Sequence, residues 1–356
     1  MNVVVVGHYP PRYKLAYYFD WRDALDSAWP GGRTTVVSTF REWPAPLAAA
    51  DRLPDRLRLR ERLPVGWTLD LRPVREAYAG EAPCDVLVYA PSFYYFNAAG
   101  RRRQLFEAAA QAGPRRFTTV FFVENEYRLL ADKVAFANAL RADVLVSQLR
   151  PEVAVPFYRE RFAGRVVSLP AGLNPEVFRP TRPLGEREIH VGTRSHPYPA
   201  GPLGDARNRL LRLCAEGRPP LDGLRIDVSL DQRQRFTRER WAAFLNRCRA
   251  TVASEAAGRL GWEDDAAGLE VGALSSRHFE AMGTRTALLL LEGRYDGILE
   301  PGRHYVPVRR DLTNLADVAA AVRDTRRLEA MTEAAHALAL DAHTYAHRVR
   351  ALAAAV

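Results

Sequence analysis

The sequence predicts an α/β protein made of two doubly wound domains. Short runs of apolar and β-branched residues alternate with helix-like segments along nearly the whole chain. The alternation starts again after a proline-rich stretch at residues 170–186. Strands that alternate with helices form parallel sheets covered by helices on both faces. At roughly 150 residues per domain, the 356 residues of the chain leave room for two such domains.

Six strands are expected in the first half of the chain. Their residues are apolar on both faces, as in strands buried between two layers of helices. The runs are Val3–Val6, Thr35–Val37, Asp85–Tyr89, Thr118–Val123, Val144–Ser147 and Val166–Leu169. Helix-like segments at Arg101–Ala112 and Arg128–Leu140 lie between them. Together these segments predict a first, Rossmann-like domain over residues 1–175.

A second set of strands is expected after the stretch at 170–186, where four prolines and two glycines interrupt any regular element. The runs are Glu188–Val191, Leu224–Val228, Ala250–Val252, Ala287–Leu291 and Tyr305–Val308. They predict a second Rossmann-like domain over residues 176–335. The chain ends in an alanine-rich helical region, Leu315–Val356, with an expected break near Asp341. We expect its last part, residues 336–356, to pack back on the first domain.

One stretch departs from this alternation. Residues 255–274 contain four glycines, several acidic residues and little periodicity, which predicts a long irregular loop. Loops of this length in a compact domain are more often functional than idle, but a surface insertion fits the pattern equally well. The Asp264-Asp265 pair resembles a metal-binding pair only superficially, because two acids in a glycine-rich loop are unremarkable. No metal site is expected.

The composition excludes several classes of protein. The three cysteines lie far apart, which excludes a disulfide framework and CxxC-type motifs. No apolar run approaches the roughly 18 residues of a membrane span, and the N-terminus does not resemble a signal peptide. A cytoplasmic protein is therefore expected, with peripheral membrane contact left open.

The net charge of +9 comes almost entirely from arginine, because only Lys14 and Lys133 among the 51 basic residues are lysines. The arginines are scattered through helix-like stretches and form no single block. This distribution favours a solvated surface, and no recognition helix or aromatic–basic motif indicates a nucleic-acid partner. A few of the arginines could still bind phosphate oxygens, which their planar fork suits.

The stretch from Ser275 to Leu315 carries the clearest functional pattern. Ser275 or Ser276 can cap a helix that begins near Arg277. The free N–H groups of its first turn and the helix dipole would form an anion site, to which Arg277 adds positive charge. Glu280 lies one turn further, where its carboxylate could accept hydrogen bonds from ribose hydroxyls. A bound nucleotide diphosphate fits this pattern, and so does an ordinary capped helix.

The same stretch resembles the donor-binding motif of retaining glycosyltransferases with the GT-B fold, in which two Rossmann-like domains face a central cleft. It is similar to the spore-maturation-type branch, whose motif is an R-x-F-E-A helix, a small residue, a buried strand and a turn containing PG. The matching residues are Arg277, Phe279, Glu280, Ala281, Gly283, Pro301 and Gly302. The linker Pro170–Phe178 and the segment Ile189–Ser195 also resemble the corresponding segments of these enzymes.

The resemblance implies a reaction and a set of binding residues. The protein would transfer a sugar from a nucleotide-diphosphate sugar to a small-molecule, natural-product or glycan acceptor, with retention at the anomeric carbon and without a metal or other cofactor. Arg194 and Arg207 would hold phosphate, and Ser229 and Leu230 would contact the base. The full set of expected donor-binding residues is Gly192, Arg194, Arg207, Ser229, Leu230, Ser275, Ser276, Arg277 and Glu280.

In one position the sequence departs from the common pattern. Many of these enzymes carry a second glutamate eight positions before the one that Glu280 matches, and this chain has Gly272 there. Either Glu270, the nearest acid upstream, takes over the role, or the role is absent. The departure supports an alternative function, a catalytically inactive nucleotide- or sugar-binding protein or partner subunit.

Three residues of the first domain are expected to be catalytic. His8 follows the first strand, next to a glycine that would let a ligand approach the backbone. Glu124 and Glu126 follow the strand that ends at Val123. Carboxylates at this position could orient an acceptor hydroxyl or act as a base, although a helix start with an acidic first turn also fits.

Overall fold

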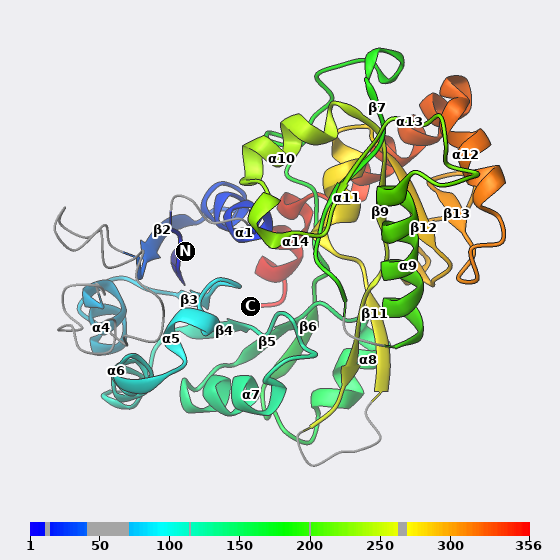
Figure 1. Ribbon diagram of the computed structural model, residues 1–356. Coiled ribbons are helices and arrows are strands. Elements are labelled where there is room, and N and C mark those ends of the chain that lie inside the picture. Colours follow the sequence, from blue (N-terminus) through cyan, green and yellow to red (C-terminus); the bar gives the residue numbers. More distant parts are fainter. Residues whose placement is uncertain (11–14, 41–70, 114, 199–200, 263–268) are drawn as a thin grey trace, which may run out of the picture.

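The computed structural model of the protein describes residues 1–10, 15–40, 71–113, 115–198, 201–262 and 269–356. Lys14 and the Asp264-Asp265 pair lie outside these residues. The chain forms two α/β domains, the N-terminal one drawn in blue to teal and the C-terminal one in green to orange (Figure 1). Each domain has its own parallel sheet, which confirms the predicted fold class.

The N-terminal domain is built on a parallel sheet with the strand order β2-β1-β3-β4-β5-β6. The strands are β1 Asn2–Gly7, β2 Arg33–Ser38, β3 Val86–Tyr89, β4 Thr118–Phe122, β5 Val144–Ser147 and β6 Arg165–Ser168. Each overlaps one of the six predicted runs. The helices are α1 Ala16–Ser27, α4 Arg72–Ala79, α5 Tyr94–Asn97, α6 Gly100–Gln111, α7 Leu130–Ala139 and α8 Pro151–Tyr158.

The C-terminal domain is built on a second parallel sheet with the order β13-β12-β9-β7-β8. The strands are β7 Ile189–Arg194, β8 Ile226–Ser229, β9 Cys248–Ala253, β12 Ala287–Leu291 and β13 Val306–Val308. The helices are α9 Pro202–Glu216, α10 Arg238–Leu245, α11 Ser276–Gly283, α12 Leu315–Arg323, α13 Thr325–Ala342 and α14 Tyr345–Ala353. Short 3-10 turns lie at Leu184–Glu186, Gln232–Gln234 and Tyr295–Gly297.

Both sheets follow one winding rule. In each, the second strand lies outside the first, and the third strand lies on the first strand's other side. The direction in which successive strands are added therefore reverses beside β1 in one sheet and beside β7 in the other. In open α/β sheets, ligands bind outside the carboxyl ends of the strands at such a switch point. The repeated order thus marks the ends of β1 and β7 as the places to search for a site.

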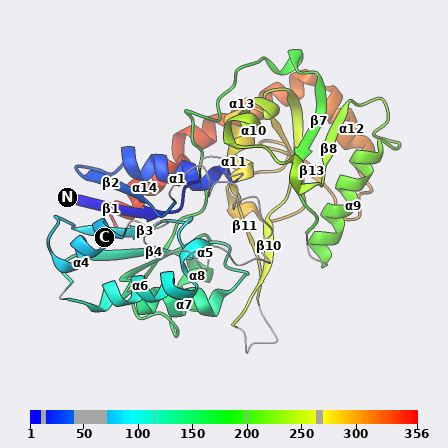
Figure 2. The same ribbon diagram turned by 60° about the vertical axis from the view of Figure 1, so that its left-hand side comes forward.

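The stretch at 255–274 is not the irregular loop that the sequence predicted. It forms an antiparallel hairpin of β10 (Ala256–Leu260) and β11 (Leu269–Ala273). The hairpin extends from the C-terminal domain and lies beside α8 of the N-terminal domain in both views (Figures 1 and 2). The ring of Trp262 stacks on Phe157 of α8 at 4.9 Å, and Leu260 is buried in the core of the N-terminal domain. The hairpin therefore connects the two domains.

The C-terminal helical region crosses back to the N-terminal domain. Its expected break near Asp341 lies between α13 and α14, and a second break follows α12. Helix α14 packs on the N-terminal domain, where Tyr345 contacts the ring of Trp21 at 5.0 Å and Val349 is buried. A bridge between Leu173 and Thr344 ties the linker to the start of α14.

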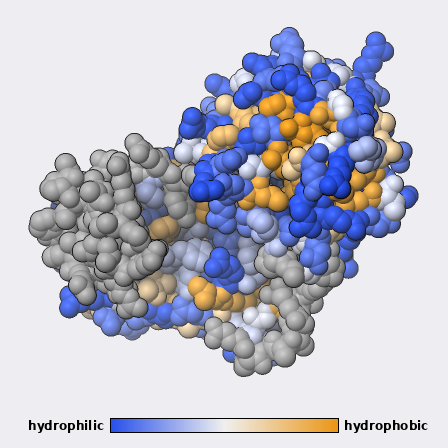
Figure 3. Space-filling model, in the orientation of Figure 1, coloured by the Kyte–Doolittle hydropathy of each residue, from blue (hydrophilic) through white to orange (hydrophobic). Residues whose placement is uncertain are grey.

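Hydrophilic residues cover much of the described surface on the face drawn in Figure 3, and hydrophobic residues gather mainly over the C-terminal domain. Many surface arginines pair with neighbouring acids, as Arg247 does with Glu188 at 2.6 Å. In the described part of the chain, no helix has both the length and the apolar character needed to cross a membrane.

Replacing Gly283 with alanine is expected to destabilise the protein. Gly283 ends α11, and a Cβ there would overlap the Leu173 side chain and the Phe178 carbonyl oxygen of the linker. Because the carbonyl belongs to the backbone, relief requires movement of the linker, at a cost of about 1–3 kcal/mol. Thermal unfolding of Gly283→Ala measures this loss. Gly185→Ala is the matched control, because its Cβ would meet only Thr325 at 3.7 Å; equal melting temperatures for both variants would contradict the packing described.

Candidate functional site

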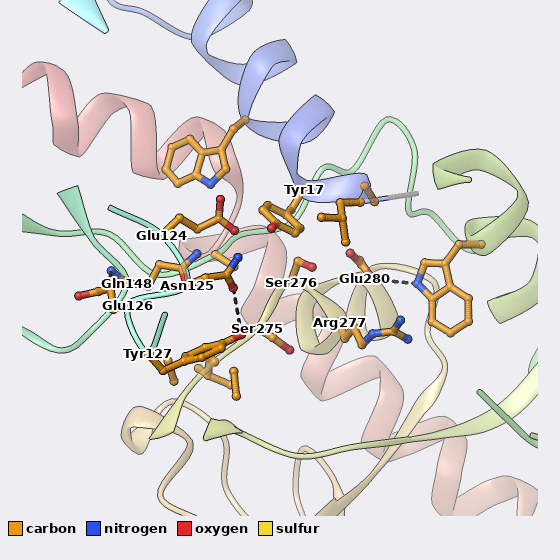
Figure 4. Close-up of a pocket in the computed structure, with 18 of the residues that line it drawn as sticks. Tyr17, Glu124, Asn125, Glu126, Tyr127, Gln148, Ser275, Ser276, Arg277 and Glu280 are labelled. Carbon is orange, nitrogen blue, oxygen red and sulfur yellow. Dashed lines mark hydrogen bonds between the residues drawn. The ribbon is translucent and has the colours of Figure 1, made fainter. Parts of the chain in front are cut away.

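A pocket lies between the two domains, where the carboxyl ends of their strands face each other. Tyr17 of α1 and Glu124, which follows β4, reach it from the N-terminal domain. Arg277 and Glu280 of α11 line it from the C-terminal domain (Figure 4). Arg194 at the end of β7 lines it from the same domain. The pocket thus occupies the location at which α/β sheets bind ligands.

The N-terminus of α11 lies at this pocket. Ser275 is the N-cap, and its backbone N–H donates a hydrogen bond to Nδ1 of His278 at 3.2 Å. Burial lowers the pKa of His278 to about 4, so that the ring is neutral and can accept this bond. Ser275, Ser276 and Arg277 all line the pocket. The predicted capped start of this helix is confirmed, and its free N–H groups and dipole favour an anion here.

Glu280 is held in place by a residue that the sequence did not single out. Nε1 of Trp241, on α10, donates a hydrogen bond to its carboxylate at 2.7 Å. Glu280 is 4% exposed and lines the pocket. The guanidinium of Arg277 lies 4.8 Å from the centre of the same Trp241 ring. Burial lowers the pKa of Arg277 to about 10, against the influence of Glu280, and the side chain stays charged at neutral pH.

Arg194 also lines the pocket, as predicted for a donor-binding residue. Its guanidinium forms an ion pair with Asp227 at 2.8 Å and lies 4.5 Å from the centre of the Phe244 ring. These contacts fix its orientation. Arg235 lines the same side. We refer to Arg194, Arg235 and Arg277 as the cationic wall of the pocket.

Arg207 does not belong to the described lining of the pocket but lies directly behind it. It is 4% exposed and donates hydrogen bonds to Ser195 and to the carbonyl oxygen of His196, the latter at 3.1 Å. Its guanidinium stacks 3.7 Å from the centre of the Tyr198 ring, and Tyr198 lines the pocket. Arg207 therefore supports the loop after β7, and direct phosphate contact stays a prediction.

Three further predicted donor-binding residues also lie outside the described lining. A Cβ on Gly192 would overlap Cys248 and Phe244, so this glycine lets β7 pack closely against α10. Ser229 ends β8, and its carbonyl oxygen accepts a hydrogen bond from the backbone N–H of Ser195 at 2.9 Å. Leu230 packs against the core of the C-terminal domain. Contact of these residues with a ligand stays a prediction.

His8 is packed inside the N-terminal domain, apart from the described lining of the pocket. Its ring stacks on Phe96 at 3.9 Å, and Nδ1 shares a hydrogen bond of 2.9 Å with the hydroxyl of Thr39. Its backbone N–H donates to the hydroxyl of Ser92 at 2.9 Å. These contacts tie the end of β1 to neighbouring loops, and the predicted catalytic role of His8 stays a prediction.

Glu126 lines the pocket, but its carboxylate is fully engaged in holding the structure. One oxygen accepts from the backbone N–H of Gln148 at 2.7 Å, the other accepts from the hydroxyl of Tyr158, and the hydroxyl of Ser147 contacts both. Burial raises the pKa of Glu126, whereas the hydrogen bonds from Tyr158, Gln148 and Ser147 lower it. This arrangement suits an anchor of the loop better than a base.

Glu124 has a free carboxylate oxygen. The side chain is 4% exposed, lines the pocket, and leaves Oε2 without a hydrogen-bond partner. Burial raises its pKa to about 8, against a hydrogen bond from Tyr17 and the charge of Lys133, which lower it. A carboxyl group that titrates near neutral pH can give or take a proton. We refer to Glu124 and Glu126 as the acidic wall of the pocket. Of the two, Glu124 has the carboxyl oxygen that is not already hydrogen-bonded.

At Gly272, where the related motif carries its first glutamate, the carboxyl group of Glu255 lies close to the backbone. A Cβ at Gly272 would lie 2.8 Å from the carboxyl carbon of Glu255. Glu255 is buried, and its Oε1 accepts a hydrogen bond from the backbone N–H of Tyr295 at 2.8 Å. A side chain at position 272 would therefore have to displace the Glu255 carboxyl group.

Local sequence could not identify two of the central pocket residues. Tyr17 and Trp241 lie within helices and belong to no motif, and only the packing of α1 and α10 brings them to the pocket. Among the residues that the structure describes, no group of three or more His, Cys, Asp and Glu side chains is arranged to hold a metal ion. Independence from metal stays a prediction.

Replacing Glu124 with glutamine is expected to remove a pH-dependent loss of stability. Because the folded-state pKa of about 8 lies above the ordinary value of 4.5, this carboxyl favours folding at low pH. That contribution is lost as the pH rises through about 8. The melting temperature of Glu124→Gln relative to the wild type should therefore rise between pH 4.5 and 8, by on the order of a few degrees, and then level off. Glu81→Gln, an exposed substitution that removes the same charge, is the control. If the melting temperature of Glu124→Gln differed from that of the wild type by the same amount at every pH, the raised pKa of Glu124 would be refuted.

The comparisons with known proteins agree with this architecture. Residues 216–354 match a family model described as "Glycosyl transferase-like". HepE of Anabaena, solved with UDP and glucose, is 12% identical with a TM-score of 0.57, over 100% of this chain and 99% of that one. Sucrose-phosphate synthase of Thermosynechococcus elongatus is 14% identical with a TM-score of 0.53, over 100% of both chains. No curated protein sequence matches the chain. The likeness to these two solved structures over the full length shows that the chain has the GT-B fold.

Proposed function

We propose that the protein is a glycosyltransferase that moves a sugar from a nucleotide-diphosphate sugar to an acceptor. One observation carries this proposal: a pocket between two Rossmann-like domains has a cationic wall on one side and an acidic wall on the other. The cationic wall suits a diphosphate, and the acidic wall suits hydroxyl groups. The match of residues 216–354 to a glycosyl transferase-like family supports it.

The C-terminal domain would bind the donor. The diphosphate would lie at the N-terminus of α11, where the N–H groups of Ser276 and Arg277 and the helix dipole favour negative charge. Arg277 and Arg194 would add charge-assisted hydrogen bonds. The ribose hydroxyls would donate to Glu280, whose carboxylate Trp241 already orients at 2.7 Å.

The N-terminal domain would present the acceptor. Glu124 is placed to accept the proton of an attacking hydroxyl or to orient that hydroxyl, because its Oε2 is unpartnered at the pocket. As the bond to the sugar breaks, negative charge develops on the leaving diphosphate, and the cationic wall would stabilise it. With this charge supplied by arginine and a helix N-terminus, we propose transfer without a metal.

Retention at the anomeric carbon is the finer part of the proposal. It rests on the resemblance of the Arg277–Ala281 helix to that of retaining enzymes. In such a reaction the departing phosphate oxygen can take the acceptor's proton, while Glu124 orients the hydroxyl. The stereochemistry of the product, read by NMR, decides between this course and one with Glu124 as the base.

Replacing Glu280 with glutamine is expected to weaken donor binding. Hydrogen bonds to a charged acceptor contribute roughly 1.5–3 kcal/mol each, so the affinity for UDP should fall about 10- to 100-fold. Calorimetric titration with UDP and UDP-glucose measures the loss; these probes follow the complexes of HepE. Trp241→Phe, which removes the N–H that orients Glu280 and reduces the ring beside Arg277, should cause a smaller loss.

Glu329→Gln, an exposed change on α13, serves as the control and should bind UDP like the wild type. Equal affinity of the wild type and Glu280→Gln would argue against Glu280 as the ribose ligand. Binding of a panel of nucleotide sugars without hydrolysis or transfer of any would instead favour an inactive binding protein.

A further inference from the structure

Lysine is almost absent from this chain, and one of its two lysines is buried beside the pocket. Among the 51 basic residues, only Lys14 and Lys133 are lysines. Lys133 lies on α7 and has an exposed fraction of 0%. Lysine is rarely fully buried unless its charge is compensated. Its position therefore requires a physical explanation.

The ammonium group of Lys133 uses all of its donors on groups that surround one turn. It donates to the carbonyl oxygen of Glu124, to that of Asn125 at 2.9 Å, and to the hydroxyl of Tyr95 at 3.0 Å. An ammonium has three N–H donors, so each has a partner. The ring of Tyr95 also lies 4.9 Å from Nζ.

The two carbonyls belong to a backbone conformation that L-residues rarely adopt. Glu124 and Asn125 have φ angles of 34° and 47°, both in the left-handed region. Such residues cost on the order of 1–3 kcal/mol each and persist where the surroundings hold them. The turn ends β4 and directs the Glu124 side chain into the pocket (Figure 4). The contacts of Lys133 hold the two carbonyls of this turn together.

Arginine would not serve here, although the chain uses it elsewhere. Lysine carries its charge on a compact ammonium with three tetrahedral donors, whereas the guanidinium of arginine is a larger planar fork. The carbonyl oxygens of Glu124 and Asn125 and the hydroxyl of Tyr95 all point at one position, which suits the three donors of a single ammonium group. The geometry therefore explains why a lysine persists in a chain of arginines.

We propose that Lys133 is a positioning residue, whose ammonium pins the Glu124–Asn125 turn and thereby fixes the Glu124 carboxyl in the pocket. The proposal extends the function proposed above, in which Glu124 acts on the acceptor. Lys133 itself does not line the described pocket. Its effect on a reaction would pass through the position and charge of Glu124.

Lys133 and Glu124 also influence each other's protonation. Burial lowers the pKa of Lys133 to about 8, while Glu124 and Glu126 raise it and Arg128 lowers it further. Loss of the ammonium charge would in turn raise the pKa of Glu124, because Lys133 is one of the groups that lower it. The other titratable groups that face this pair are Tyr94 and Tyr95 of α5, Tyr17 of α1, Tyr345 of α14, and Tyr127.

The rarity of lysine permits a direct test that needs no substrate. Protein labelled with ¹³C at the ε-carbon of lysine should give two signals, which Lys14→Arg assigns. The Lys133 signal should titrate with a midpoint well below that of a free lysine, and Glu124→Gln should move this midpoint lower still, because a negative charge is lost. A Lys133 midpoint that does not respond to Glu124→Gln would overturn the proposed coupling.

A second test measures function with UDP-glucose as the probe. Lys133→Met should leave UDP affinity within about twofold and reduce the rate of UDP-glucose hydrolysis roughly 100-fold, as small displacements of catalytic groups do. Its pH–rate profile should shift upward with the raised pKa of Glu124. Lys133→Arg should keep the charge but not restore the rate. Tyr95→Phe, which removes the hydroxyl that accepts the third hydrogen bond of Lys133, is the matched control and should lose much less activity.

The outcomes separate the two proposals. Wild-type rate and pH profile in folded Lys133→Met would overturn the positioning role. A wild-type protein that neither binds UDP nor hydrolyses UDP-glucose would count against the proposed function, while the lysine titration would still decide whether Lys133 and Glu124 are coupled. Thermal unfolding of each variant establishes that it is folded, and Tyr95→Phe supplies a second folded reference.

Discussion

An ion-pair junction between the two domains holds the opposing sides of the pocket together. Arg238 of α10 contacts Asp20 at 3.2 Å and Asp23 at 2.6 Å, both on α1, and the amide of Asn174 in the linker donates to Asp20 at 2.9 Å. Asp20 is 1% exposed. Arg238 forms its ion pair with the partly exposed Asp23 and also holds Asp20, whose pKa burial raises to about 8. The junction therefore holds α1 against α10, and the opposing walls of the pocket with them.

Helix α10 connects this junction to the proposed donor site. Arg238 and Trp241 are three positions apart, and residues at that spacing lie on the same face of a helix. Arg238 holds the N-terminal domain, while Trp241 orients Glu280. On the other side of the pocket, the Trp262 hairpin packs on α8, and Tyr158 of α8 donates to Glu126. Each wall of the pocket is thus supported by a contact that crosses between the domains.

The fold and the α11 motif could be predicted from sequence because they depend on local patterns. Strand runs and a serine cap followed by a helix are set by neighbouring residues. The hairpin at 255–274 could not, since its glycines mask the alternation and its stability comes from Trp262 and Leu260 packing on the other domain. Tyr17 and Trp241 could not be predicted as pocket residues either, because only the tertiary packing of α1 and α10 brings them to the pocket. The sequence does show that Lys133 is one of only two lysines. Its role could be inferred only from the structure, where it is buried and contacts the Glu124–Asn125 turn.

The pocket separates groups whose charge is fixed from groups whose charge varies near neutral pH. Burial raises the pKa of Glu124 in the pocket, and that of Asp20 in the nearby Arg238 junction, to about 8. Arg277, even with its pKa lowered to about 10, remains a cation. As the pH rises through about 8, negative charge therefore accumulates on the side of the N-terminal domain while the cationic wall stays constant. A bound diphosphate would add to the negative charge beside these carboxyls and favour their protonated forms. Under the proposed function, donor binding would thus be coupled to proton uptake by these carboxyls.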